Sequence, residues 1–157
     1  MSLLAEYRAA RRAEDTARLR RSLALRAMAA SGATQRDMAA ELGISQPAVS
    51  QQLRSGPRPG DVHPEALLDA GGPILRQLAE QRGFTELAVF GSVARGEARC
   101  DSDVDLVVRQ PPGTTISGLR ALQQLFAAVL DRPVDLITYG GLKPGLDDDI
   151  LREAVLL

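Results

Sequence analysis

In the first third of the chain, apolar residues recur at the spacing of amphipathic helices. Residues 3–30 contain neither Gly nor Pro, so they predict one long helix or two abutting helices. Two shorter helices are predicted behind it, over residues 35–42 and 46–54, because a hydroxyl side chain able to cap a helix precedes each of them. The Pro- and Gly-rich residues 55–60 cannot continue a helix, and they end this pattern.

Beyond that break, short apolar runs alternate with helical segments. Residues 86–90 and 133–138 are apolar stretches of strand length, and residues 103–108 alternate acidic and apolar positions before becoming wholly apolar. Strands that alternate with helices indicate an α/β layer. Helices are predicted around these strands over residues 64–82, 117–130 and 147–157, with the Gly-Gly-Pro of 71–73 as a candidate interruption of the first.

We therefore predict two domains of different class. Residues 1–56 form an all-α domain, residues 57–64 a linker, and residues 65–157 an α/β (α+β) domain with a small mixed sheet. The charge distribution supports this division, because residues 1–60 contain ten Arg against five acidic residues, whereas residues 61–157 contain fifteen acidic residues against nine basic ones. A basic half suggests a polyanionic partner, and an acidic half suggests cations or a cationic surface.

The composition excludes several classes of protein. The single Cys100 cannot form a disulfide within the chain, and the single His63 cannot build a zinc site of His and Cys ligands. No apolar run approaches the roughly 18–20 residues that a membrane span needs, and the charged N-terminus does not resemble a signal peptide. We therefore expect a cytoplasmic protein.

Residues 35–50 contain what a sharp turn between two crossing helices requires. Ala39 is small where the helices cross, and Gly43 can adopt the left-handed backbone of the turn. Ile44 and Val49 supply apolar side chains for the shared core. This spacing resembles the helix-turn-helix of phage repressors and their bacterial relatives. A helical hairpin used for protein contact is the alternative.

The resemblance implies a DNA-binding domain whose recognition helix is residues 46–54, with its first turns in the major groove. Glutamine can pair with adenine there, whereas phosphate contacts position the helix without reading sequence. A single unit of this kind binds DNA weakly, so we expect a homodimer or a hetero-oligomer. The expected base contacts are Gln46, Ser50 and Gln51, and the expected phosphate contacts are Gln35, Arg36 and Arg54.

The acidic strand that follows residues 86–90 has the strongest chemical signal. It opens with Asp103 and Asp105, which the alternation of side chains along a strand places on one face. Two adjacent carboxylates repel each other. Unless one of them is protonated, a bound Mg²⁺ or Mn²⁺ usually neutralises this repulsion. Asp135 lies in the middle of the next predicted strand. If the two strands are neighbours, its acid completes a three-carboxylate cluster.

A Gly-Ser followed after ten residues by Asp-x-Asp, with a third Asp on a later strand, resembles the nucleotidyltransferase superfamily that includes DNA polymerase beta. The sequence Gly-Ser-Val-Ala-Arg-Gly at residues 91–96 resembles the corresponding motif of the minimal (MNT-type) nucleotidyltransferases of bacteria and archaea. The resemblance implies that Gly91 and Ser92 bind the triphosphate of ATP, and that Arg95 adds charge there or is a solvated surface residue. It also implies that the three acids are catalytic and hold two metal ions: Asp103, Asp105 and Asp135.

The same resemblance implies a protein partner. Minimal nucleotidyltransferases of this kind are often antitoxins that transfer AMP to a tyrosine of a helical ribonuclease toxin of the HEPN type. A fused helix-turn-helix suits an antitoxin that represses its own operon. The alternative is a transcriptional regulator that senses nucleotide or docks a partner without turnover. An antibiotic-modifying enzyme is disfavoured because no aminoglycoside pocket domain is recognisable.

Overall fold

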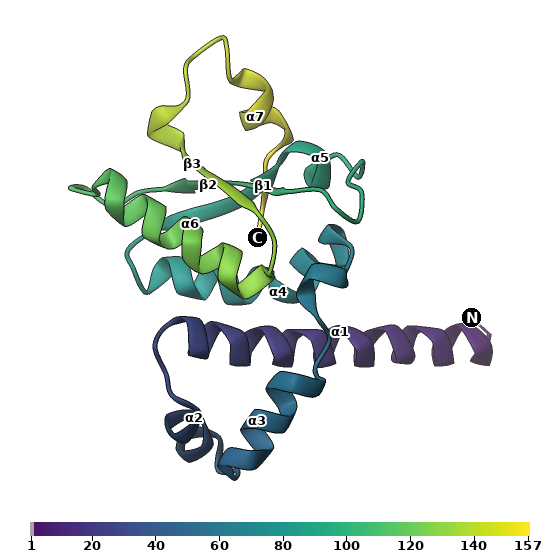
Figure 1. Ribbon diagram of the computed structural model, residues 1–157. Helices are drawn as coiled ribbons and strands as arrows, with labels where there is room; N and C mark the ends of the chain where they lie inside the picture. The colour runs from purple at the N-terminus through teal and green to yellow at the C-terminus, as the bar shows by residue number, and fades with distance from the viewer. Residues whose placement is uncertain (1) are drawn as a thin grey trace.

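The computed structural model describes residues 2–157, in which three helices precede a small sheet covered by further helices (Figure 1). No helix in this range is long and apolar enough to cross a membrane. The helices are α1 (Leu3–Ala30), α2 (Gln35–Leu42), α3 (Gln46–Ser55), α4 (Pro64–Glu80), α5 (Gly91–Ala94), α6 (Ile116–Leu130) and α7 (Asp148–Glu153). The strands are β1 (Thr85–Phe90), β2 (Val104–Arg109), β3 (Val134–Thr138) and β4 (Val155–Leu156), with 3₁₀ turns η1 (Pro59–Asp61) and η2 (Tyr139–Gly141).

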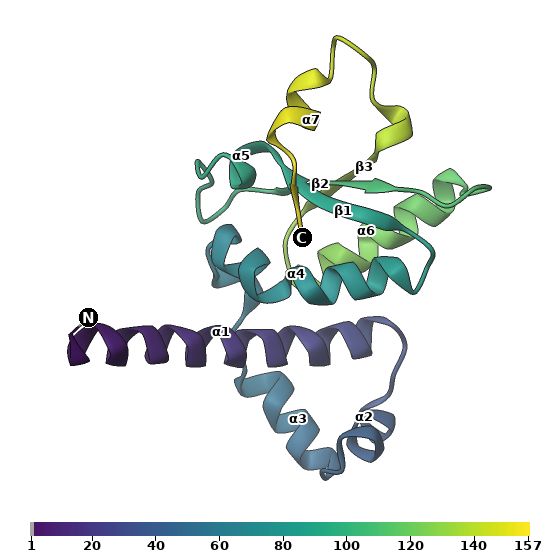
Figure 2. The same cartoon turned by 180° about the vertical axis from the view of Figure 1, so that it is seen from behind.

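The sheet is mixed and has the order β3-β2-β1-β4. Strand β1 is antiparallel to both β2 and β4, whereas β2 and β3 are parallel and are connected through the crossover helix α6. Helices α4 and α6 cover one face, and the segment that contains α7 lies over the other (Figures 1 and 2). The predicted α+β domain with a small mixed sheet is therefore confirmed.

The end of the chain differs from the prediction. A single helix was expected over residues 147–157, but α7 ends at Glu153 and the chain turns into β4. In β4, Val155 and Leu156 pair with Val89 and Ala88 of β1. The physical reason is that β1 would otherwise be an open edge of the sheet. Val155 is β-branched and therefore favours a strand over a further turn of helix.

Helix α4 continues through the Gly-Gly-Pro that was a candidate interruption. Gly71 and Gly72 are buried in its middle, and a Cβ added at Gly71 would lie 3.0 Å from a methyl group of Leu23. The glycine therefore permits the close approach of α4 to α1 rather than a break in the helix.

Helix α1 contributes to two cores at once. Leu19, Leu23 and Ala27 are buried against α4 and α6 in the large core beneath the sheet. Leu25 faces the other way, into a small core with Met38, Ala39 and Val49 from α2 and α3. Although residues 57–64 separate α3 from α4 in sequence, the N-terminal helices are therefore not resolved as a separate domain.

Arginines on α1 strengthen its attachment to the sheet-bearing part. The Arg20 guanidinium donates from Nε to the Ala70 carbonyl at 3.0 Å. Arg26 donates to the carbonyls of Ala128 and Val129 at 2.8 and 3.0 Å, in the last turn of α6. Carbonyls in the last turn of a helix have no partner within the helix, so Arg26 satisfies acceptors that would otherwise need water.

The ends of α2 and α3 confirm the capping residues that the sequence predicts. The Thr34 hydroxyl accepts from the Asp37 amide, and the Asp37 carboxylate accepts from the Thr34 amide in return. Gly43 ends α2 in the left-handed conformation, with φ of 66°. The Ser45 hydroxyl then accepts from the Ala48 amide at the start of α3.

Candidate nucleotide site

The sheet face under α7 carries the acidic residues. Val104 and Leu106 of β2 are buried in the large core, so Asp105 between them points to the opposite face. In the parallel register, Asp105 is directly paired with Asp135 of β3. The two acids that the sequence predicts on separate strands are therefore neighbours on one face of the sheet.

Asp105 experiences both burial and repulsion. Partial burial raises the pKa of its carboxyl, and the nearby carboxylates of Asp135 and Asp103 raise it further. Asp103 lies one residue before β2 and is exposed, whereas the prediction placed it at the start of the strand. Asp105 therefore lies in a region of negative charge, which disfavours the ionised form of its carboxyl.

The carboxylates do not form a ready-made metal cage. Within residues 2–157, no three side chains of His, Cys, Asp or Glu converge into a group that could hold a metal ion, which departs from the expected three-carboxylate cluster. Mg²⁺ is usually bound by one or two carboxylates together with substrate phosphates rather than by an all-protein cage. The donor set therefore fits a hard divalent cation whose coordination a nucleotide completes.

Gly91 joins β1 to α5 directly beside this acid. Phe90 is the antiparallel partner of Asp105, and Gly91 follows it with φ of 72°, a conformation that favours glycine. A Cβ at Gly91 would collide with the Asp105 carboxylate. Glycine is thus required here by two independent constraints, and the half-buried Ser92 follows at the first turn of α5.

Glu153 is a residue of this region that the sequence analysis missed. Its Oε1 accepts from the Gly91 amide at 2.9 Å, and its carboxylate pairs with the Arg95 guanidinium at 3.0 Å. The bond from the Gly91 amide is the main cause of the lowered pKa of Glu153. The Arg95 guanidinium also pairs with Glu97 at 3.1 Å, so this exposed side chain is held by two carboxylates. No sequence motif signals Glu153, because its partners lie far away in the chain.

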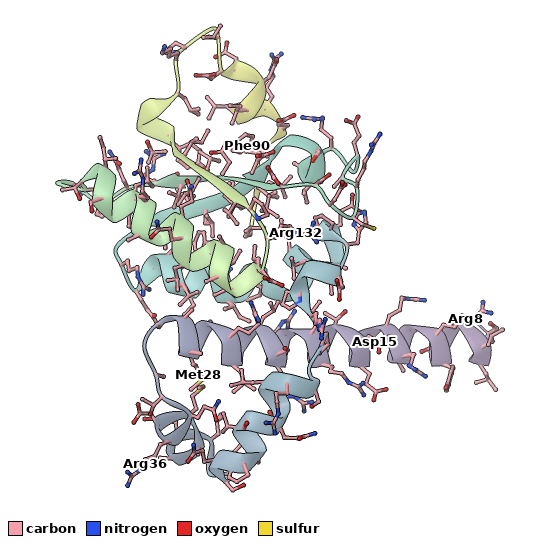
Figure 3. The ribbon with its side chains drawn as sticks, in the orientation of Figure 1. Arg8, Asp15, Met28, Arg36, Phe90 and Arg132 are labelled. Carbon is pink, nitrogen blue, oxygen red and sulfur yellow. The ribbon has the colours of Figure 1, made fainter. Side chains whose placement is uncertain are left out.

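Arg132 is a second residue that the sequence analysis missed. Its side chain is only 7% exposed and lies between the sheet and the residues before α4 (Figure 3). It donates to the carbonyls of Cys100 and Ser102 at 2.6 and 2.9 Å, and to those of Gly60 and Val62 at 3.2 and 2.7 Å. Arg132 therefore fixes the loop that carries Asp103 to the segment between α3 and α4.

The expected DNA contacts lie at the opposite end of the molecule. Val49 of α3 is buried, and Gln51 and Arg54 point towards the opposite side of the helix. Gln46 is three residues before Val49 and lies nearer to the buried side. Figure 3 shows Arg36 projecting away from the body at the tip of α2. Among the expected contacts, the exposed residues are Arg36, Gln46, Gln51 and Arg54, and the half-buried residues are Gln35 and Ser50.

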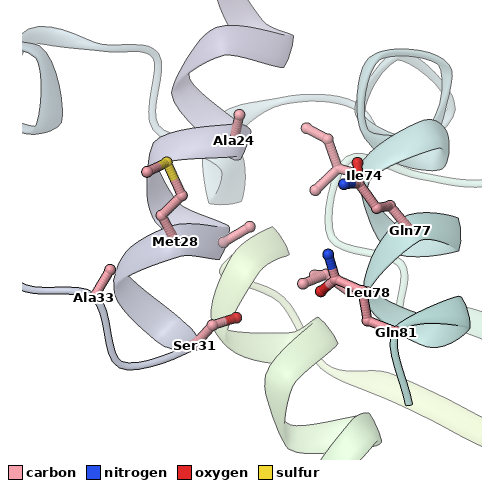
Figure 4. Close-up of a pocket in the computed structure, with 9 residues that line it drawn as sticks. Ala24, Met28, Ser31, Ala33, Ile74, Gln77, Leu78 and Gln81 are labelled. Atoms are coloured by element: carbon pink, nitrogen blue, oxygen red, sulfur yellow. The ribbon is translucent and has the colours of Figure 1, made fainter. Parts of the chain in front are cut away.

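A pocket of about 360 Å³ lies between α1 and α4, away from the acids (Figure 4). Its walls are mostly apolar, with Met28, Ile74 and Leu78 among them, and its polar groups are uncharged. A pocket without cationic groups does not suit a triphosphate, so the acidic face of the sheet remains the candidate site.

The family model described as nucleotidyltransferase domain matches residues 73–157, which is more than half of the chain. The chain belongs to the nucleotidyltransferase family. The matched segment contains the Gly-Ser turn, all three acids and Glu153, and it excludes α1, α2 and α3.

Individual relatives agree with this assignment. The protein adenylyltransferase MntA of Thermococcus cleftensis is 39% identical over 80 residues, which are 51% of this chain and 81% of that protein. A Methanocaldococcus jannaschii protein, provisionally described as a protein adenylyltransferase, is 37% identical over 48% of this chain and 81% of its own length. A solved structure described as a candidate minimal nucleotidyltransferase is 39% identical, with a TM-score of 0.55 over 59% of this chain and 95% of that chain. The protein is therefore a nucleotidyltransferase with a minimal fold.

Proposed function

We propose that this nucleotidyltransferase transfers AMP from ATP to a hydroxyl group of a partner protein. The observation that carries the proposal is the direct pairing of Asp105 with Asp135 beside the Gly91 turn. Two relatives bear names that describe protein adenylyltransferases, which supports a protein as the acceptor.

In this proposal, Asp103, Asp105 and Asp135 are the residues that would hold two Mg²⁺ or Mn²⁺ ions. Such ions stabilise the charge on the attacking and departing oxygens of an in-line displacement. Ser92 donates to the phosphates, and Arg95 adds positive charge. The acceptor oxygen would form a bond to the α-phosphorus and pass its proton to Asp135, while the bond from phosphorus to the bridging oxygen breaks and pyrophosphate leaves. Catalysis of this type depends on positioning and electrostatics more than on covalent chemistry.

The acceptor that we propose is a tyrosine of a helical HEPN-type toxin, so that the protein acts as its antitoxin. The test mixes the full-length protein with α-labelled ATP, Mg²⁺ and the product of the neighbouring gene. We expect label on the neighbour, and no label with Asp105→Asn. Inhibition of the neighbour that survives Asp105→Asn would instead favour a nucleotide-sensing or partner-docking regulator that does not turn over.

We propose in addition that α2 and α3 bind DNA as a helix-turn-helix, in a dimer or with the partner. The support is the exposed side of α3, opposite the buried Val49, together with the cap and left-handed turn that join the two helices.

Gln51→Ala is expected to reduce discrimination at one base pair by about 1–3 kcal/mol. Arg36→Ala is expected to weaken binding to all sequences and to reduce the salt slope by about one. Binding measured on operator and scrambled duplexes at several salt concentrations distinguishes the two effects, and no binding to either duplex contradicts the proposal.

A further inference from the structure

One carboxylate is bound to two donor groups that the proposed site would use to bind a triphosphate. Glu153 accepts the Gly91 amide hydrogen at 2.9 Å and, at the same time, pairs with the Arg95 guanidinium at 3.0 Å. Gly91 is the backbone donor next to the acids, and Arg95 is the cation that we assign to the phosphates. A nucleotide that binds with its phosphates at these groups meets a negative charge already in place.

We infer that Glu153 is a residue of the nucleotide site, and that its carboxylate competes with the triphosphate for the Gly91 amide and the Arg95 guanidinium. This inference rests on the proposed function. It assigns to Glu153 the role of setting the affinity of the site for phosphates, through charge and through occupation of shared donors.

Electrostatics favours competition over a permanent supporting role. Asp105 lies in the field of Asp135, Asp103 and also Glu153, with only Arg95 acting in the opposite direction. A triphosphate brought to the same place adds several negative charges to this group. Release of Glu153 removes one repulsive charge and returns Arg95 to the incoming phosphate, so nucleotide and Glu153 exclude each other.

The segment that carries Glu153 has few buried contacts before the chain enters β4 and pairs with β1. Helix α7 has no buried residue, and Leu146 and Leu151 are 76% and 54% exposed. Its apolar attachment comes from the half-buried Ile150 and Ala154, which rest on a small cluster around Phe90. The Glu153 side chain is 22% exposed, so its pair with Arg95 and its bond from the Gly91 amide are the contacts that a triphosphate has to displace.

The experiment measures the dissociation constant of the full-length protein for ATP, using a non-hydrolysable analogue with Mg²⁺, and for adenosine as an uncharged comparison. Glu153→Gln keeps an oxygen that can accept from the Gly91 amide but removes the charge, and Glu153→Ala removes both. We expect both variants to bind the ATP analogue roughly threefold to tenfold more tightly than wild type, with unchanged adenosine binding. Asp149→Asn removes one charge from the same helix at an exposed position and is expected to change neither value.

Hydrogen exchange of residues 146–154 gives a second measurement on the wild-type protein. Competition predicts faster exchange in this segment when the ATP analogue and Mg²⁺ are added, because Glu153 is released. A supporting role predicts slower exchange, and weaker ATP binding in both Glu153 variants. Either of those results, or equal affinity in wild type and variants, overturns the inference. Absence of ATP binding in wild type and in every variant overturns the proposed nucleotide site itself.

Discussion

The sheet and the α2–α3 pair differ in how much of the molecule supports them. The acids lie on strands embedded in a large core that extends from α1 to the sheet. The α2–α3 pair has a core of four buried residues, one of which, Leu25, belongs to α1. A site on strands is fixed by long-range packing, whereas the surface of α2 and α3 depends on a few contacts and on local caps. The two regions should therefore fail in different ways when they are altered.

The largest effect is expected from Asp135→Asn, which removes the charge of a proposed metal ligand without changing the size of the side chain. Transfer of labelled AMP should fall by about a hundredfold or more, because loss of charge stabilisation costs several kcal/mol and each 1.36 kcal/mol is tenfold in rate. Binding to DNA should be unchanged. Asp131→Asn is the matched control, since Asp131 is exposed just before the same strand. Normal transfer by Asp135→Asn would show that β3 does not contribute to the chemistry.

The next effect concerns the smaller core. Met38 is 1% exposed, and Met38→Ala should destabilise the α2–α3 pair by about 2–5 kcal/mol. DNA binding should then be lost while ATP binding persists, as two titrations of one preparation would show. Leu42→Ala on the same helix removes a half-exposed side chain and should change little. Equal loss of both activities by Met38→Ala would mean that the two cores unfold together.

A smaller effect is expected at the junction of the two regions. Arg132→Lys cannot reach four carbonyls, because an ammonium on a flexible stem lacks the fork of the guanidinium. The loop before Asp103 should loosen, so the transfer rate should fall about tenfold and should need more Mg²⁺ for half-saturation. Arg120→Lys on the exposed side of α6 is the control. A lower melting temperature with an unchanged Mg²⁺ requirement would limit Arg132 to a structural role.

The smallest effect is a gain in stability. Because the folded protein raises the pKa of Asp105, this group contributes stability only while it is protonated, and the contribution is lost as the pH rises through the raised pKa. Without metal or nucleotide at neutral pH, Asp105→Asn should therefore raise Tm by about 2 °C, a small gain because solvent screens a partly buried carboxyl. Thermal melts should show the gain shrinking towards acidic pH. A gain that does not depend on pH would need another cause.

Local signals in the sequence were sufficient for much of the fold. The caps at Thr34 and Ser45, the turn at Gly43 and the alternation around Asp105 depend on neighbouring residues, and the structure confirms them. The pairing of Asp105 with Asp135 could be stated only conditionally, because sequence alone does not reveal which strands are adjacent.

The remaining features depend on partners that leave no pattern in the sequence. Arg26 and Arg132 bind backbone carbonyls, and any residue can supply a carbonyl. Glu153 reaches Gly91 across 62 positions of the chain. The pairing of β4 with β1 depends on an edge that exists only after the sheet has formed. Tertiary placement, rather than local preference, decided each of these cases.

The double role of α1 limits how this architecture can be rearranged. A cut at residues 57–64 would leave α4 and α6 without the side chains of Leu19 and Leu23, and α2 and α3 without Leu25. The α2–α3 pair is therefore not an interchangeable part that recombination at the linker could transfer to another enzyme. Any rearrangement of this chain that preserves both cores has to carry α1 with it, because α1 supplies buried side chains to each of them.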